Sequence, residues 1–365
     1  MMNYCDKTKY RVFSVQQAAF QQMVNQLLQQ IPRQESVLRL VFFGAPKTND
    51  EYISQHTILR ERMQAYFGDK IPAFSYVSQS PLNAAIVVEV HSFTPDKEDR
   101  LFYKKHETCP YVVLENKEGR FLYAGGCQSD SIDKTIEIQS RETFRLIGGL
   151  LEREGFPINR IIRQWNYIEQ ITRIREANQN YQSFNNARSD FYGKTLWVNG
   201  YPAATGIGTD TGGVLVDFNA AVFTSLETFT TPIDNDLQIA AHAYSEKVLK
   251  RAQAQKATPK FERARSVTFS GRRIVHISGT AAIRGEESLK DTGIEKQLHI
   301  TMENIARLIG GAVLQMLRVY LKNKADLQVV KKLMDNYNLS IPISYLRADI
   351  CREELLVEIE GIAID

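Results

Sequence analysis

The sequence predicts an α+β protein built from three copies of one unit, in which two helices cover one β-sheet. The first observation is a repeated pattern of a proline and two strand-like runs, with an acidic residue in the second run. The spacing is 17 residues from Pro72 to Glu89, 15 from Pro202 to Asp217 and 16 from Pro342 to Glu358. The second observation is that the same order of helix and strand patterns precedes each proline. A repeat of this kind indicates a chain made of similar structural units.

Each copy can be followed through its apolar periodicity. The first amphipathic helices are predicted at 15–28, 143–154 and 294–309, the strands after them at 37–43, 161–167 and 314–321, and the second helices at 58–67, 181–192 and 325–337. The second and third copies open with a further strand pair, which the first copy lacks. A complete copy is therefore β-β-α-β-α-β-β. We expect a truncated unit at 1–100, a complete unit at 101–240 and a third unit at 241–365.

The C-terminal stretch 341–360 is predicted to form a β-hairpin whose connection contains Arg352-Glu353-Glu354. In its second strand, alternation places Leu356, Glu358 and Glu360 on one face. A carboxylate among aliphatic residues is costly to bury, so this face is either exposed to water or carries an acid with a raised pKa and a function.

Composition narrows the classes of function. The 365 residues include 45 basic and 42 acidic residues, a net charge of +3, so no basic surface for nucleic acid is indicated. Four cysteines without a C-x-x-C pair argue against a disulfide framework and a zinc site, and the six histidines show no ligand spacing. We expect no metal, no cofactor and no membrane segment, and a cytoplasmic location.

The order of elements resembles the chorismate-mutase-like fold of the reactive-intermediate deaminase family, also called YjgF-like. The third copy carries the matching residues: Ile277-Ser278-Gly279-Thr280, Gln297, Asn304-Ile305 and Val357-Glu358-Ile359-Glu360. Members of that family are homotrimers with active sites between subunits. The resemblance therefore implies a pseudo-trimer within one chain, acting as a monomer, with one competent site.

Motifs along the whole chain resemble those of the chorismatases. They are Arg163-Gln164-Trp165-Asn166-Tyr167-Ile168, Tyr181-x-x-Phe184-Asn185-x-x-Arg188, Pro202-Ala203-Ala204-Thr205-Gly206-Ile207-Gly208, Phe261-x-Arg263-Ala264-Arg265-Ser266 and Asp349-x-Cys351-Arg352-x-x-Leu355-Leu356-Val357-Glu358-Ile359-Glu360. This resemblance implies a cofactor-free enzyme that removes the enolpyruvyl side chain of chorismate as pyruvate. In the family the strand glutamate at the position of Glu358 is the catalytic acid, which would protonate the enol methylene. Glu89 and Asp217 would be structural or vestigial counterparts.

Chorismate is a dianion, so a site for it needs hydrogen-bond donors. Arginine forks, tyrosine hydroxyls and the backbone amide at Gly279 are the candidates, each arginine being equally compatible with a structural ion pair. The candidate substrate-binding residues are Arg163, Arg188, Tyr201, Ala264, Arg265, Ser278, Gly279, Tyr345 and Arg347.

Two residues give different indications of the ring product. Cys351 lies where the resemblance to 3-hydroxybenzoate-forming members places a cysteine, whereas Ala264 is closer to the hydrolytic members. We expect 3-hydroxybenzoate first, a dihydroxycyclohexadiene carboxylate second and 4-hydroxybenzoate third. A non-catalytic binding protein on the same scaffold is the alternative from another class. Imine hydrolysis is disfavoured, because Tyr345 lies near the place where the deaminases use an arginine.

Overall fold

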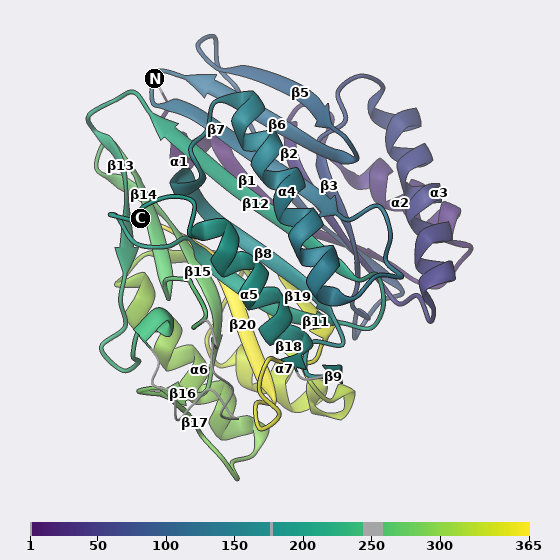
Figure 1. The fold of residues 1–365 in the computed structure, drawn as a ribbon, viewed down its shortest axis with the longest axis vertical. Coiled ribbons are helices and arrows are strands. Elements are labelled where there is room, and N and C mark those ends of the chain that lie inside the picture. The colour runs from purple at the N-terminus through teal and green to yellow at the C-terminus, as the bar shows by residue number, and fades with distance from the viewer. Residues whose placement is uncertain (1, 176–177, 244–257) are drawn as a thin grey trace.

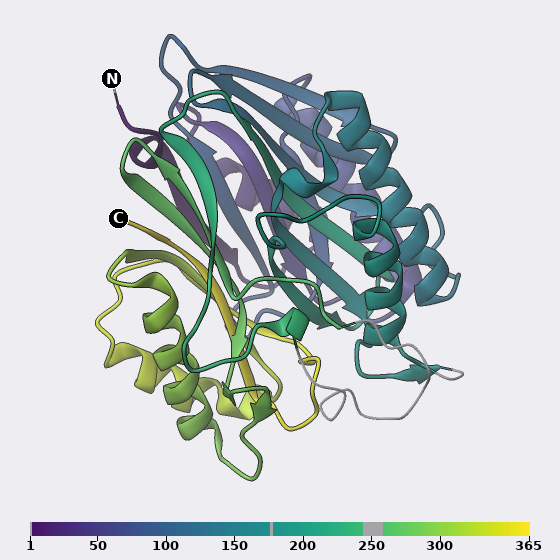
Figure 2. The same ribbon diagram turned by 60° about the vertical axis from the view of Figure 1, so that its left-hand side comes forward.

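The computed structural model describes residues 2–175, 178–243 and 258–365. Three β-sheets form the interior, and the longer helices lie outside them (Figure 1). Figure 2 shows α4 and α5 on one outer side and α6 and α7 on another, with strands between them. The predicted α+β class and the three-copy architecture are confirmed.

The first copy has a four-stranded sheet in the order β1-β4-β2-β3. Its elements are β1 (Thr8–Val15), α2 (Phe20–Gln30), β2 (Ser36–Gly44), α3 (Asn49–Phe67), β3 (Ala73–Ser78) and β4 (Ile86–Phe93), after a short α1 (Tyr4–Lys7). Because β1 pairs with β4, the first copy keeps one opening strand, and it lacks the strand pair of the other two copies, as the truncated unit predicts. Thr48 caps α3 by accepting a hydrogen bond from the Glu51 amide, so this helix begins nine residues earlier than expected.

The second copy has a six-stranded sheet in the order β11-β8-β12-β7-β6-β5. Its elements are β5 (Arg100–His106), β6 (Cys109–Asn116), β7 (Gly119–Gln128), α4 (Ile136–Glu154), η1 (Ile158–Arg160), β8 (Ile161–Glu169), β9 (Ile174–Arg175), β10 (Asn178–Gln179), α5 (Asn180–Tyr192), β11 (Ala203–Thr209) and β12 (Val214–Phe223). Helix α4 begins after the cap Thr135 and ends at Gly155, whose left-handed conformation suits glycine.

The third copy has the order β13-β14-β15-β20-β18-β19. Its elements are β13 (Thr228–Ile233), η2 (Ala241–Ala243), β14 (Ala264–Phe269), β15 (Arg272–Ala281), β16 (Ile283–Arg284), β17 (Glu287–Ser288), α6 (Ile294–Ile309), β18 (Val313–Leu321), η3 (Lys324–Asp326), α7 (Leu327–Asp335), β19 (Ile343–Arg347) and β20 (Val357–Ile364). Strand β13 precedes residue 240 but pairs with β14. We propose unit boundaries near residues 100 and 240, with β13 preceding the second boundary while it belongs to the sheet of the third copy.

The predicted C-terminal hairpin is wrong. Strand β19 runs parallel to β18 and β20 runs antiparallel to it, so β18 lies between them. The same arrangement occurs for β3, β2 and β4 and for β11, β8 and β12. The segment between Arg347 and Val357 is longer than a hairpin turn and carries the chain across the end of β18.

Two expectations about cysteines and membranes can be compared with the structure. Cys109 and Cys127, on the paired strands β6 and β7, form a disulfide, so the argument against disulfides from spacing is wrong for this pair. A hairpin brings together two residues that are 18 apart in sequence. Among the described residues, no helix is both long and apolar enough to cross a membrane.

Candidate active site

Strand register makes the three copies comparable residue by residue. Arg39 lies opposite His91, Arg163 opposite Asn219 and Arg318 opposite Glu360. Two residues further along the first strand of each pair, Val41 lies opposite Glu89, Trp165 opposite Asp217 and Tyr320 opposite Glu358. The three acids matched by sequence spacing are therefore structural equivalents, and so are three arginines.

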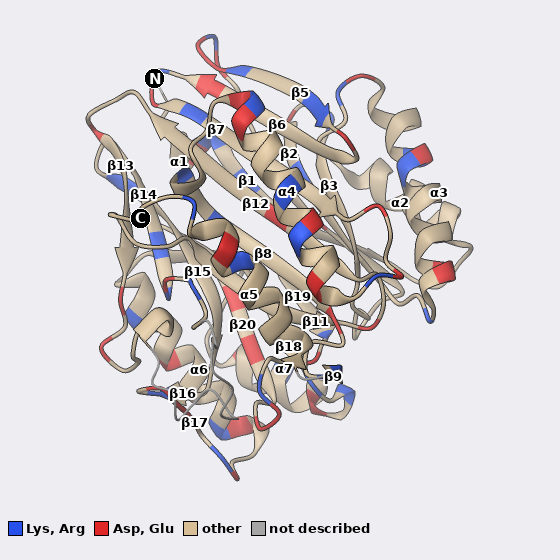
Figure 3. Cartoon of the chain, in the orientation of Figure 1, with Lys and Arg blue, Asp and Glu red and all other residues tan. Residues whose placement is uncertain are grey.

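The equivalent arginines connect each copy to the next. Arg318 donates to Glu89 in the first copy through Nε at 2.9 Å and through Nη2, and also to Glu360 at 2.6 Å. Arg163 forms an ion pair with Glu360 in the third copy. Arg39 donates to Asn219 in the second copy at 2.9 Å. All three arginines are buried, so this ring of contacts joins the copies inside the protein. Figure 3 shows acidic residues along β20 in the interior.

The three equivalent acids have different hydrogen-bond partners. Glu89 is held by Arg318 through both carboxylate oxygens. Asp217 accepts from Ser75 Oγ at 2.5 Å and from the Gly126 amide at 2.8 Å. Within residues 2–175, 178–243 and 258–365, we find no hydrogen bond to the carboxyl group of Glu358. Asp217 uses one oxygen only, since its Oδ2 has no partner, whereas Glu358 is the one acid of the three with neither carboxyl oxygen in a hydrogen bond among the described residues.

Glu358 is also an acid that holds its proton near neutral pH. Its side chain is buried, with a residue exposure of 5%. Burial and the nearby charge of Glu360 raise its pKa to about 8, against the opposing charges of Arg163 and Arg263. Glu360 lies on the same face of β20, and its pKa is shifted in the opposite direction. Burial alone would raise the pKa of Glu360, but the charges of Arg318 and Arg163 outweigh this effect and lower it. At neutral pH the pair therefore comprises a protonated Glu358 and an ionised Glu360.

The wall beside Glu358 is formed by Gly279 and Thr205. The Thr205 hydroxyl accepts from the Gly279 amide at 3.0 Å and from Arg163 at 2.7 Å, and donates to Glu360. The Gly279 amide is thus occupied by Thr205 in this structure. A side chain at Gly279 would overlap a carboxylate oxygen of Glu358, since an added Cβ would lie only 3.0 Å from Cδ of that residue.

We predict that Gly279→Ala reduces activity and lowers stability by about 1–3 kcal/mol, because the added methyl group displaces Glu358 or Thr205. Turnover and urea denaturation measure the two effects. Gly293→Ala is the matched control, since a Cβ there meets nothing within 4 Å. Equal effects of the two substitutions would contradict this packing.

Cys351 and Tyr181 lie near the same carboxyl group. Burial, with a contribution from Glu358, raises the pKa of the Cys351 thiol to about 12, so the sulfur stays protonated and is a poor nucleophile. Cys351 is a free cysteine that packs between two apolar clusters. Burial also raises the pKa of Tyr181, which senses the charges of Cys351 and Glu358. These two side chains are suited to shape a pocket rather than to transfer a proton.

Arg188 is a buried guanidinium without a carboxylate partner among the described residues. Its Nη2 donates to Asn185 at 2.6 Å, its Nε has no hydrogen-bond partner, and it lies over the ring of Phe184 at 5.5 Å. The charges of both Arg188 and Glu358 act on Tyr181, so Arg188 lies in the neighbourhood of Glu358. An incompletely paired buried cation is a natural partner for a substrate carboxylate.

Several sequence-predicted residues have other roles in the structure. Arg265 donates to the backbone carbonyls of Asn199 and Tyr201, and Ser278 bridges the Glu262 carbonyl and the Ala204 amide. These contacts join the second and third copies. Tyr201 packs with Tyr192 and Trp197, and its amide donates to Glu262.

Three further candidates are not brought to Glu358. Ala264 and Tyr345 lie in the core between the third sheet and its helices. Arg347 is half-exposed and forms an ion pair with Asp210. The structure therefore brings Glu358 together with Gly279, Cys351 and Arg163, and places Arg188 nearby through Tyr181.

Sequence reasoning missed Glu360, Arg318 and Arg263 as determinants of the environment of Glu358. The alternation of β20 already placed Glu360 on the face of Glu358. Aligning the three central strands would have shown an arginine at the same position in each, which is the available signal for Arg318. No sequence signal distinguishes Arg263 from Arg265. Among the described residues, no group of three or more His, Cys, Asp or Glu side chains is arranged to hold a metal ion.

The protein belongs to the class of chains that fuse three units, each a β-sheet covered by helices. Buried arginines join its three units, and one of its three equivalent acids accepts no hydrogen bond among the described residues. Residues 99–220 match the family model described as "Chorismatase FkbO/Hyg5-like, N-terminal". A 3-hydroxybenzoate synthase of Streptomyces hygroscopicus is 30% identical over 233 residues, covering 58% of this chain and 65% of that protein. A chorismatase of Streptomyces rapamycinicus is 29% identical over 238 residues, covering 60% of this chain and 66% of that protein.

The matched regions span just under two thirds of these curated relatives. A chorismatase crystal structure covers 98% of this chain and 98% of its own, with a TM-score of 0.72 and 20% identity. The chain is therefore related in sequence to the chorismatases and has their fold. The resemblance predicted from its motifs is confirmed.

Proposed function

We propose that the protein removes the enolpyruvyl side chain of chorismate as pyruvate, with Glu358 as the proton donor. The names of its relatives support the substrate. The observation that carries the proposal is the buried, unengaged Glu358, whose pKa is raised to about 8 while its two counterparts are held by hydrogen bonds. An acid of this kind is protonated at neutral pH and positioned for general acid catalysis.

The reaction begins when Glu358 protonates the terminal methylene of the enol ether. This forms a methyl group and an oxocarbenium ion at the adjacent carbon, and leaves a carboxylate that stabilises the cation. Arg188 binds one substrate carboxylate through its incompletely paired guanidinium. Arg163 contacts Thr205 and Glu360, and its positive charge limits the rise in the pKa of Glu358. No organic cofactor or metal is required for these steps.

The fate of the oxocarbenium ion sets the ring product. Attack by a ring oxygen and loss of pyruvate gives 3-hydroxybenzoate, and the atoms balance without added water. Attack by water consumes one water molecule and gives the dihydroxycyclohexadiene carboxylate. We place 3-hydroxybenzoate first, with Cys351 excluding water beside Glu358, the diene second and 4-hydroxybenzoate third.

Incubation of the purified protein with chorismate tests the function directly. Pyruvate is followed with lactate dehydrogenase and NADH, and the ring product is identified by mass and ultraviolet spectrum. In ¹⁸O-labelled water, the hydrolytic route places the label in the ketone oxygen of pyruvate at the moment of release. Tight binding of chorismate without pyruvate release would instead make the protein a non-catalytic binder and end the proposal.

We predict that Cys351→Ala shifts the product ratio toward the diene, because the smaller side chain admits water near Glu358. The ratio of the two ring products, measured by chromatography, is the readout. Cys5→Ala removes the other free cysteine, a buried residue of α1, and should leave the ratio unchanged. An unaltered ratio in the Cys351 variant would argue against its role in excluding water.

A further inference from the structure

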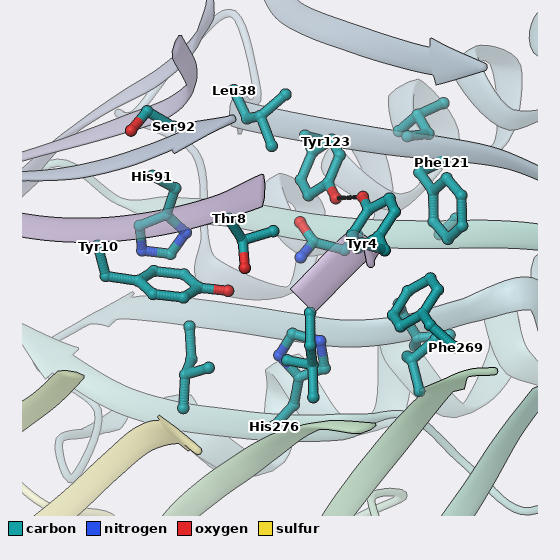
Figure 4. Close-up of a pocket in the computed structure, with 17 residues that line it drawn as sticks. Tyr4, Thr8, Tyr10, Leu38, His91, Ser92, Phe121, Tyr123, Phe269 and His276 are labelled. Carbon is teal, nitrogen blue, oxygen red and sulfur yellow. Dashed lines mark hydrogen bonds between the residues drawn. The ribbon is translucent and has the colours of Figure 1, made fainter. Parts of the chain in front are cut away.

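A small cavity with several polar groups in its lining, not including Glu358, lies where all three copies meet. Figure 4 shows side chains from β1, β4, β7 and β15 converging on it. Its volume is about 30 Å³. Since a water-sized occupant needs roughly 10–15 Å³ on this measure, the cavity has room for one small ion or two water molecules. Its polar lining comprises Thr8, Tyr10, His91, Ser92, Asn219 and His276, together with the hydroxyls of Tyr4 and Tyr123.

Two buried imidazoles each have a nitrogen without a partner. His91 Nε2 and His276 Nδ1 make no hydrogen bond, and these residues are 5% and 7% exposed. Arg39 lies 3.2 Å from His91 Nδ1, and because a guanidinium has only donors, Nδ1 must accept. The neutral imidazole therefore carries its hydrogen on Nε2, where it is an unsatisfied donor. A buried donor of this kind is costly unless another group accepts from it.

The charges around the cavity favour an anion. Burial and the charges of Arg39 and Arg318 keep the pKa of His91 well below its usual range, and burial with Arg163, Arg39 and Arg265 lowers that of His276 to about 3. Both rings are therefore neutral at pH 7. No carboxylate is among the lining residues, whereas Arg39 lies directly behind His91 and Asn219. The Oδ1 of Asn219 accepts from Arg39, which leaves its amide N–H groups to face another acceptor.

We propose that this cavity binds a single small monovalent anion of the halide class. The His91 Nε2–H group donates to the ion, and the amide of Asn219 and the hydroxyl of Tyr10 contribute further donors. The charge of Arg39 supplies the field: its contacts are to Asn219, to His91 and to the face of Trp165 at 3.9 Å, and the opposing charge that acts on it, that of Asp217, does not line the cavity. A metal cation is disfavoured, since the described lining offers two imidazoles and no carboxylate.

The proposal is tested with bromide as the probe. Crystals grown in sodium bromide should show an anomalous peak in the cavity within hydrogen-bond distance of His91 Nε2. In solution, the Tm should rise by roughly 2–3 °C for each tenfold increase in bromide above its dissociation constant, relative to sodium gluconate of equal ionic strength. His91→Leu should abolish this response, and His91→Gln, which retains a donor, should keep it.

His299→Gln is the matched control, because His299 is an exposed residue of α6, and it should respond to bromide as the original chain does. An empty or water-filled cavity in bromide crystals would overturn the proposal. So would an undiminished bromide response in His91→Leu, or a zinc soak that fills the cavity in the absence of halide. The crystallographic result decides the question even if the leucine variant does not fold.

Discussion

Replacement of Glu358 by Gln is expected to lower pyruvate release from chorismate by about 10²–10⁴-fold, the contribution typical of a general acid. Glutamine has the same shape and can occupy the space beside Gly279, but it cannot donate a proton to carbon. Steady-state turnover with the lactate dehydrogenase assay measures the loss. Asp217→Asn is the matched control, because Asp217 is the equivalent acid held by Ser75 and Gly126, and its turnover should stay within a few-fold of the original.

The pH dependence of the original enzyme should report the same group. Since the pKa of Glu358 is about 8, kcat/KM should be level below that value and fall tenfold per pH unit above it. A profile that continues to rise from pH 8 to pH 9 would contradict the assignment of Glu358 as the acid.

Stability gives an independent test of the raised pKa. The folded-state pKa of about 8 exceeds the ordinary value of 4.5, so the original protein loses stability as pH rises from about 4.5 to 8 and levels off beyond. The glutamine variant avoids this cost, which is on the order of a few kcal/mol. It should equal the original near pH 4.5 and be more stable at pH 8.5, as measured by urea denaturation. Equal stability at both pH values would show that Glu358 is not desolvated.

Replacement of Arg318 by Met is expected to destabilise the fold by about 3–5 kcal/mol at pH 7. Methionine fills part of the space but leaves Glu89 without its cationic partner, and leaves Glu360 with Arg163 alone. The pKa of Glu360, which Arg318 helps to lower, then rises, so the loss should be smaller near pH 5 than at pH 7. Urea denaturation at the two pH values measures it.

Arg141→Met provides the comparison for Arg318. Arg141 also pairs with two carboxylates, Glu137 and Asp190, but its side chain is half-exposed. Its replacement should cost less than about 1 kcal/mol, as is usual for surface ion pairs. A similar cost for both arginines would mean that the buried ring does not hold the copies together.

Much of the fold could be predicted because each copy repeats the same local signals. Apolar periodicity located the central strands and α6, and proline spacing matched Glu89, Asp217 and Glu358 before their register was known. Strand order could not be obtained in this way. Whether β19 pairs with β20 or with β18 depends on the path of the connecting segment, and local alternation is the same in both cases.

The candidate site was predictable to a smaller extent. Strand alternation alone left the face of Glu358 compatible with exposure to water, and the role of catalytic acid was predicted from the resemblance to the chorismatase motifs. Arg265 and Arg347 were equally plausible as substrate ligands, since an arginine in a sequence does not show which carbonyl or carboxylate it contacts. Arg188 is buried, as Arg265 is, and differs from both through its incomplete pairing, which is a tertiary property.

The head-to-tail ring of Arg39, Arg163 and Arg318 has a consequence for how such a protein can diverge. In a trimer of separate identical chains, any substitution at this ring alters all three junctions at once. Covalent linkage removes that constraint, so each junction can change alone. All three junctions here keep a buried arginine contact, and the one that joins the second and third copies also holds Glu358, so selection can adjust the reactivity of this junction without altering the other two.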